Sequence, residues 1–215
     1  LAGGFDGFGD THRAQYFHDE GDGITFLEKA VKYGAKFQEN ENSSQVSLFG
    51  DASDVQIPEP IVPPCEEWNT MEKLAKEKEV VGIYISGHPL DDYKYEMKYF
   101  CGTKLEYLKD LNALVGKNVS IGGIITKIEH RVSKNGKGWA MFTLEGYDES
   151  YDFRIFGEEY LKFRHFLIPN SFLYLKVSLR RSWQGGDVRV NISTVQQLQD
   201  VLSKMAKKLT IQLDI

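Results

Sequence analysis

Residues 118–128 have the sequence NVSIGGIITKI, and this stretch decides the fold. Val119 and Ile121 occupy odd-numbered positions beside polar residues, as in a β-strand. Ile124 begins a second alternation at even-numbered positions. The apolar residues change from odd-numbered to even-numbered positions at Gly122-Gly123. A glycine bulge there would keep both apolar sets facing one core while bending the strand. The stretch therefore predicts a bent strand of the kind that a small closed barrel requires.

The sequence after this stretch predicts the remaining strands of such a barrel. Strand-like segments occur at residues 139–145, 151–156, 172–181 and 188–193, and Asn135-Gly136 marks the turn between the first two strands. The apolar spacing over residues 158–167 indicates a helix between the third and fourth strands. Five strands with a helix at this point are the order of an OB-fold. The predicted fold class is α+β, with a small helical segment and a linker followed by a five-stranded OB-fold β-barrel.

The chain before the barrel divides by composition. Residues 1–37 combine a glycine-rich opening with short helical patterns, and residues 38–66 are rich in Asn, Ser, acidic residues and Pro, which predicts a flexible linker. Residues 67–115 form a predicted helical connector. In it, Asn69 and Glu72 are placed as a capping box, and Pro89 suits the first position of a second helix. The OB-fold is assigned to residues 116–195, and residues 196–215 to a C-terminal helix and strand leading to a further domain.

Charge is distributed unevenly along the chain. The net charge is -5, yet residues 116–195 hold 12 Lys and Arg against 8 Asp and Glu, a net of +4, which leaves -9 for the rest. Binding to phosphates is therefore expected only in the predicted barrel.

Composition also excludes several classes of protein. No apolar run of about 18 residues predicts a membrane span, and no signal peptide is recognisable, so a cytoplasmic protein without membrane partners is expected. Cys65 and Cys101 are too few for a disulfide framework and are not spaced as a metal pair. Both are predicted to be reduced thiols, and no metal site is expected.

One surface of the predicted barrel concentrates cations and aromatic rings. In the fourth strand, Leu173, Leu175 and Val177 alternate inward, which turns Tyr174 and Lys176 outward. With the loops between strands one and two and between strands four and five, this surface predicts a single-stranded DNA-binding site. Its candidate residues are His130, Arg131, Lys134, Lys137, Trp139, Tyr174, Lys176, Arg180, Arg181, Trp183 and Arg189. The alternative is that the cations are merely solvated and that Trp139 and Trp183 cap the barrel ends.

Several segments resemble the bacterial DNA polymerase III alpha-subunit family. The run EKEVVGIYISGHPLD at residues 77–91 resembles the segment that joins the family's tandem helix-hairpin-helix region to its OB domain. Residues 4–9 are similar to the end of the helix-hairpin-helix region, and residues 122–125, 134–137 and 142–145 to the opening of the OB domain. The family usually has a Leu-Glu-Asp turn after the second OB strand, whereas this chain has Gly146-Tyr147-Asp148.

This resemblance spans nearly the whole chain and implies a C-terminal fragment of the replicative polymerase, from the end of the helix-hairpin-helix region through the OB domain. The family's polymerase carboxylates and phosphoesterase domain lie upstream. It therefore implies no catalytic residue, cofactor or metal in this chain, although the parent would be a DNA-directed DNA polymerase, a nucleotidyltransferase that uses Mg²⁺.

The predicted linker contains an apolar pair with a preceding glutamine, in Gln45, Leu48 and Phe49. This spacing is that of the bacterial sliding-clamp-binding peptide. Two apolar side chains can enter a preformed pocket while the glutamine amide fixes the register, so only a few residues must be ordered. The alternative is a small satellite contact of Leu48 and Phe49 with their own domain.

The leading hypothesis is thus a non-catalytic part of the polymerase that binds single-stranded template DNA and the sliding clamp and supports processive replication. The main alternative is a protein-protein interaction module that contacts other replisome subunits and whose OB-fold does not bind DNA. An OB-containing nuclease or synthetase arm is disfavoured, because no metal or nucleotide motif accompanies the barrel.

Overall fold

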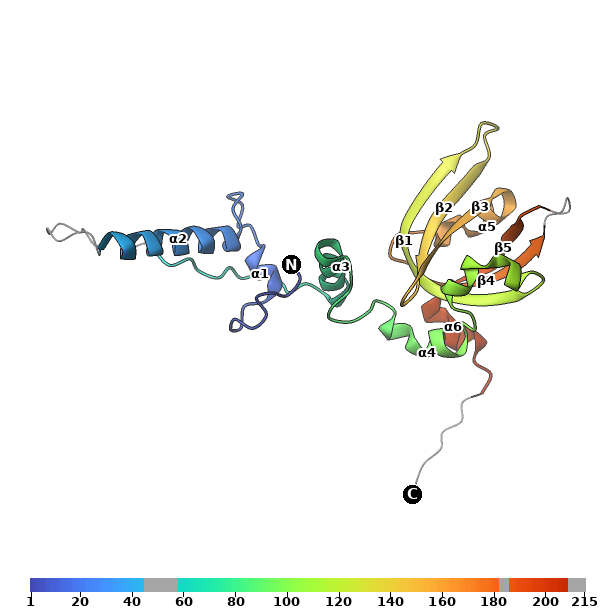
Figure 1. The fold of residues 1–215 in the computed structure, drawn as a ribbon, viewed down its shortest axis with the longest axis horizontal. Coiled ribbons are helices and arrows are strands. Elements are labelled where there is room, and N and C mark those ends of the chain that lie inside the picture. The colour runs from blue at the N-terminus through green and yellow to red at the C-terminus, as the bar shows by residue number, and fades with distance from the viewer. Residues whose placement is uncertain (45–57, 182–185, 209–215) are drawn as a thin grey trace, which may run out of the picture. The chain divides into compact units, whose positions relative to one another are not determined.

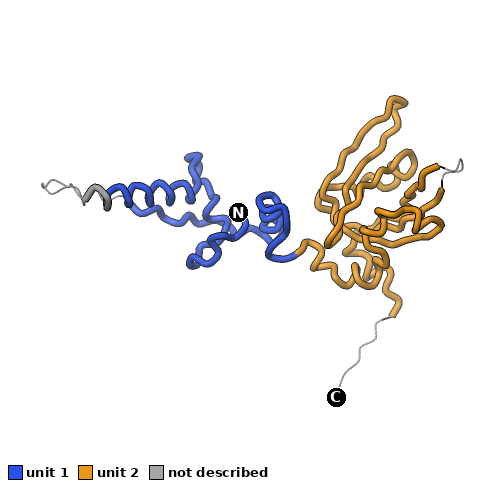
Figure 2. Tube along the Cα trace, viewed as in Figure 1, with its two compact units in different colours: residues 1–87 blue, residues 88–215 orange. Residues whose placement is uncertain are grey.

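The computed structural model describes residues 1–44, 58–181 and 186–208 (Figure 1). The chain forms two compact units, residues 1–87 and residues 88–215 (Figure 2). We call them the helical unit and the sheet unit. No helix within the described ranges is both long and apolar enough to cross a membrane.

The helical unit contains α1 (Arg13–Tyr16), α2 (Phe26–Ser44) and α3 (Thr70–Val81). The predicted capping box at α3 is confirmed: Glu72 N donates to Asn69 Oδ1, and Asn69 N donates to the Glu72 carboxylate, both at 3.0 Å. Gly82 ends α3 in the left-handed region, with φ of 86°, where a glycine has no Cβ to clash. Residues 38–44 are helical as the last part of α2, although their composition predicts the start of a linker.

The sheet unit begins with short helices: η1 (Asp91–Tyr93), α4 (Lys94–Tyr99), η2 (Leu105–Lys109) and η3 (Leu111–Leu114). Pro89 precedes the first of these instead of starting it. The reason is local, because the Asp91 carboxylate accepts a hydrogen bond of 2.7 Å from the His88 amide, and η1 begins at Asp91. The predicted second helix is therefore a 3-10 turn that continues as α4.

The five predicted strands are all present. They are β1 (Asn118–Val132), β2 (Gly138–Glu145), β3 (Ser150–Phe156), β4 (Phe172–Arg181) and β5 (Val188–Gln197). Helix α5 (Gly157–Phe163) and the 3-10 turn η4 (Arg164–Phe166) lie between β3 and β4, and α6 (Leu198–Met205) follows β5. The antiparallel order is β3-β2-β1-β4-β5. Among the described residues β3 and β5 do not pair, so the expected closed barrel is a curled sheet with an open seam between them.

The core of the sheet unit lies on the inner face of this sheet. Phe142 and Phe153 stack there at 5.3 Å between ring centroids, and Leu173, Leu175 and Val177 of β4 are buried as predicted. A second cluster covers part of the outer face of β4 and joins Leu90, Tyr174, Leu198 and Val201. Helices α4 and α6 therefore cover β4 and the part of β1 around Gly122, whereas Lys127, Glu129 and Arg131 further along β1 are exposed. Figure 1 shows both helices at one end of the sheet.

The predicted glycine bulge at Gly122-Gly123 is wrong. Pairing between β1 and β4 continues without a shift from Asn118 to Ile124, and the shift occurs later, between Ile125 and Lys127, opposite β2. The two glycines instead permit close approach. A Cβ at Gly122 would lie 2.5 Å from Met97 Sδ, and one at Gly123 would lie 2.5 Å from the Glu145 carbonyl oxygen.

Candidate nucleic-acid interface

The uncovered outer face of β1, β2 and β3 carries three rows of side chains. Residues paired directly across an antiparallel sheet share a face. One row is Arg131, Trp139 and Phe156, the next is Glu129, Met141 and Arg154, and the third is Lys127, Thr143 and Asp152. We call these nine residues the outer face. Figure 1 shows that β1 and β2 extend past the other strands as a long hairpin, so one end of this face projects from the sheet.

The first row is a stack of one cation and two rings. The Trp139 and Phe156 rings lie 5.4 Å apart with planes 20° from parallel, and the Arg131 guanidinium carbon lies 5.6 Å from the Trp139 ring. Phe156 is 56% exposed, which is high for so large an apolar side chain in a strand. The row therefore presents an open aromatic surface beside a positive charge.

The other two rows mix charges of both signs. Arg131 also pairs with the Glu129 carboxylate on its own strand, and Thr143 Oγ1 donates to Asp152 at 2.6 Å. Arg154 and Lys127 are exposed. Each of these two rows therefore holds one cation and one carboxylate, with Arg154 and Glu129 in one row and Lys127 and Asp152 in the other.

The hairpin tip and the inner side of β1 hold three other predicted residues. Lys134 and Lys137 are exposed in the tight turn that joins β1 to β2, where Ser133 N donates to the Lys137 carbonyl at 2.8 Å. His130 lies on the opposite side of β1 from Arg131, and its Nδ1 is 3.2 Å from the Tyr160 hydroxyl of α5. The structure thus brings the two lysines to the end of the outer face and places His130 against α5.

The strands β4 and β5 bring two arginines face to face. Arg180 is directly paired with Arg189, and both are exposed, with Arg181 next to them and Lys176 further along β4. Like charges placed opposite each other in a sheet destabilise it. An anion between Arg180 and Arg189 would relieve this repulsion.

The open seam between β3 and β5 is a groove of about 810 Å³, which we call the seam groove. Arg154 and Phe156 line it from β3, and Arg189 and Asn191 line it from β5. Glu159 of α5 also lines the groove, and burial raises the pKa of its carboxyl group although the Ile192 amide donates to it. The groove therefore connects the outer face to the arginine pair of β4 and β5.

Of the predicted contact residues, one needs correction and four lie outside the described residues. Tyr174 points to the expected side of β4, but it is only 2% exposed because Leu90, Leu198 and Val201 cover it. It cannot stack on a base, and its assignment as a DNA contact is wrong. Trp183 and the clamp-peptide residues Gln45, Leu48 and Phe49 lie outside the described residues.

Phe156, Arg154 and Lys127 are not among the contact residues predicted from the sequence. The first two could have been predicted, because the alternation along β3 that buries Phe153 and Ile155 turns Arg154 and Phe156 outward. No three His, Cys, Asp or Glu side chains in the described ranges are grouped to hold a metal ion, and both cysteines are free.

The fold and this surface define the class as an α+β protein with an OB-fold domain. No protein-family model matches the chain. It is similar to the DNA polymerase III alpha subunits of Treponema pallidum (32% identity over 174 residues, 81% of this chain and 14% of that protein) and Campylobacter jejuni (35% over 162 residues, 72% and 12%). The Escherichia coli O157:H7 subunit matches at 26% identity over 215 residues, 99% of this chain and 18% of that protein.

Over most of its length the chain is therefore similar to one segment of the DNA polymerase III alpha subunit, and it spans 12–18% of the length of these three relatives. Two solved structures match the chain only weakly. A lipoprotein from Klebsiella pneumoniae aligns at 15% identity over 49% of this chain and 86% of that one, with a TM-score of 0.30, and RecG bound to a three-way DNA junction aligns at 13% over 80% and 24%, with a TM-score of 0.29. Scores this low do not indicate a common fold.

Proposed function

We propose that this chain is the part of a bacterial replicative polymerase that binds single-stranded DNA during DNA replication, through the outer face and the seam groove. The stacked row of Arg131, Trp139 and Phe156 carries the proposal. A base can stack on the exposed Phe156 ring while the Arg131 guanidinium contacts a neighbouring phosphate. Nucleotidyl transfer with Mg²⁺ then belongs to other parts of the parent polypeptide.

The aromatic row favours single strands over duplex DNA. In a duplex the faces of each base are already covered by neighbouring bases, so an exposed ring has no partner to stack on. Every base has a π-face and phosphate contacts read no sequence, so binding is expected to be salt-sensitive with little sequence preference.

The seam groove extends the path beyond the aromatic row. Arg154 lies two residue pairs along from Phe156 on β3, and Arg189 faces the same groove from β5. Because Arg189 also opposes Arg180, a phosphate chain that leaves the aromatic row can neutralise Arg154 first and the Arg180–Arg189 pair next. The strand is therefore proposed to cross the open seam.

Removing Arg154 and Arg189 together will weaken binding to a fluorescein-labelled 12-nucleotide oligo-dT. Loss of two exposed cation contacts should lower the affinity by about tenfold at low salt. It should also reduce the magnitude of the slope of log K against log salt concentration by about 1.4, because each phosphate contact on a single strand contributes about 0.7 to this slope. Fluorescence anisotropy of the complete chain at several salt concentrations measures both quantities.

The matched control removes two exposed cations that are not on the outer face, Lys162 and Arg164 of the α5–η4 segment. Its affinity should stay within about twofold of wild type, since nonspecific attraction changes equally in both variants. If both variants lose the same affinity for the oligonucleotide, the seam groove is not part of the path of the DNA strand. Absence of wild-type binding at low salt would instead favour the protein-protein interaction module of the replisome.

We also propose that residues 45–49 bind the sliding clamp, as their sequence predicts. The support is chemical: the QVSLF peptide offers two large apolar side chains and one amide within five residues. Insertion of such a pair into an apolar pocket gives useful affinity at a small ordering cost.

Replacing both Leu48 and Phe49 with alanine will abolish co-elution with a bacterial sliding clamp in size-exclusion chromatography. Burial of each side chain contributes about 1.5–3 kcal/mol, so the double variant should lose about 100-fold or more in affinity. Val55→Ala, which removes an apolar side chain elsewhere in the predicted linker, serves as the control and should co-elute normally. Unchanged co-elution of the double variant would contradict the assignment.

A further inference from the structure

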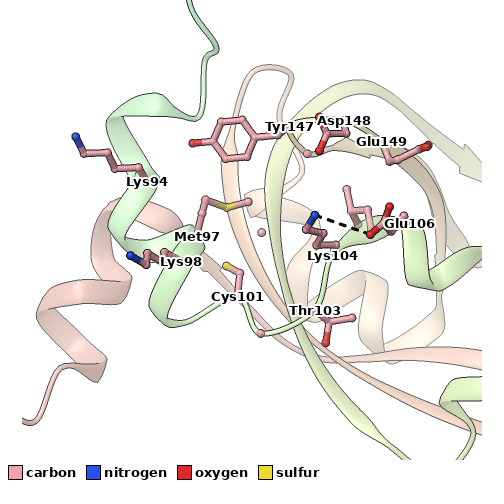
Figure 3. A pocket seen from close by; sticks show the side chains of 14 residues that line it. Lys94, Met97, Lys98, Cys101, Thr103, Lys104, Glu106, Tyr147, Asp148 and Glu149 are labelled. Atoms are coloured by element: carbon pink, nitrogen blue, oxygen red, sulfur yellow. Dashed lines mark ion pairs between the residues drawn. The ribbon is translucent and has the colours of Figure 1, made fainter.

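A second cavity of the sheet unit lies away from the outer face, beside α4 (Figure 3). It has a volume of about 510 Å³, within the range of sites that take a small ligand or a side chain. Its walls come from α4, residues 101–106, Gly122 of β1 and the turn from Gly146 to Glu149. We call it the α4 pocket.

The interior of the α4 pocket is apolar. Figure 3 shows the side chains of Met97, Cys101 and Tyr147 around its centre. Burial, aided by the charge of Glu96, raises the pKa of the Cys101 thiol to about 12, so this group stays protonated and uncharged at neutral pH. Tyr147 is held in place because its hydroxyl donates to the Leu90 carbonyl at 2.9 Å. The methionine thioether can adapt its shape to an inserted group.

Positive charge gathers on one side of the opening. Lys94 and Lys98 lie four residues apart on α4, a spacing at which like charges slightly destabilise a helix. Each lies over a neighbouring tyrosine ring, at 5.3 and 5.2 Å, and neither forms an ion pair with a described carboxylate. Three carboxylates line the facing side: Glu149 pairs with Lys109 at 2.7 Å and Glu106 with Lys104 at 3.9 Å, whereas Asp148 is exposed.

The pocket does not suit a nucleotide. Bidentate recognition of a phosphate needs the planar fork of an arginine, and the α4 pocket has no arginine. Its nearby amides are occupied, since Gly102 N donates to Ser120 Oγ at 3.1 Å and Thr103 N to the Ser120 carbonyl at 3.0 Å. A base would also leave its polar edge unpaired against sulfur and hydrocarbon.

We propose that the α4 pocket is a docking site for a short acidic peptide segment of a partner protein, with one large apolar side chain inserted beside Met97 and carboxylates at Lys94 and Lys98. The apolar cavity supplies burial for the side chain, and the unpaired lysines supply charge complementarity. This site is independent of the outer face, so the DNA interface can be correct whether or not the peptide binds.

The test uses a fluorescein-labelled tetrapeptide of three aspartates followed by phenylalanine, titrated with the complete chain under reducing conditions at low salt. We expect saturable binding that weakens about fivefold in the Lys94→Ala, Lys98→Ala double variant. Changing the phenylalanine of the probe to alanine should weaken binding about tenfold or more.

Two controls make the result specific. The double variant Lys117→Ala, Lys208→Ala removes the same charge from exposed positions outside the pocket and should bind as wild type does. A probe with three lysines in place of the aspartates should not bind. Equal binding of the lysine probe, full retention by the Lys94 and Lys98 variant, no binding of the acidic probe, or its displacement by deoxyadenosine monophosphate would each overturn the proposal.

Discussion

Replacing Glu77 with alanine will destabilise the helical unit by about 3–5 kcal/mol, the usual cost of leaving one partner of a buried ion pair without the other. Glu77 is completely buried on α3, and its carboxylate accepts a 2.6 Å hydrogen bond from Arg13 Nη1. The same carboxylate accepts from the Ile85 and Ser86 amides, at 2.8 and 2.9 Å, and from the Ser86 hydroxyl. One side chain thus joins α1, α3 and the segment that follows α3.

Hydrogen–deuterium exchange over residues 70–87 measures this loss, because the Ile85 and Ser86 amides should exchange much faster in the variant. The control is Glu79→Ala, which removes an exposed carboxylate two residues away on the same helix. Its stability should change by no more than about 0.5 kcal/mol. Wild-type protection of these amides in the Glu77 variant would show that the buried pair contributes little.

The same carboxylate makes the stability of the helical unit depend on pH. Burial alone would raise the pKa of Glu77, but hydrogen bonds from Ser86, Arg13 and the two amides outweigh it and lower the pKa to about 2. A glutamate in the unfolded chain has a pKa of about 4.3. The carboxylate therefore stabilises the fold above about pH 4.3, and this contribution is lost as the pH falls toward 2. Glu77→Gln should lack this part of the acid sensitivity.

Local patterns predicted much of this architecture. The capping box of Asn69 and Glu72 needs only neighbouring residues, and the alternation in β4 needs only one buried face, so both could be predicted from the sequence. The burial of Tyr174 could not be predicted from the sequence. Its alternation placed it outward correctly, but the layer that buries it comes from Leu90 and Leu198, which lie far away in the sequence.

The candidate site shows the same limit. Arg131 and Trp139 could be predicted as neighbours because one tight hairpin joins their strands. Phe156 completes their row only through the register of β2 with β3, and Arg154 meets Arg189 only because the curled sheet brings β3 near β5. Strand periodicity gives the face of a residue, whereas register and curvature decide which residues share a site.

The two glycines of β1 illustrate how register sets a close contact. At Ile124 the strand β1 changes partners, since it pairs with Phe172 of β4 on one side and with Glu145 of β2 on the other. Gly123 lies just before this point, where a Cβ would also lie 2.8 Å from Leu144 Cγ. The strand can pass between β2 and β4 here only because residue 123 has no side chain.

Gly123→Ala should therefore destabilise the sheet unit by about 3 kcal/mol, the upper part of the usual range for overpacking, because its methyl group meets the backbone carbonyl of Glu145. Gly122→Ala should cost less, since the Met97 and Cys101 side chains that it meets can move into the α4 pocket. A Cβ at residue 186 would meet open space, so Gly186→Ala should leave the stability nearly unchanged. Urea unfolding of the three variants measures this order of stability. If the Gly123→Ala protein is as stable as Gly186→Ala, β2 can move to make room for the methyl group. The contact would then not fix the register between β1 and β2.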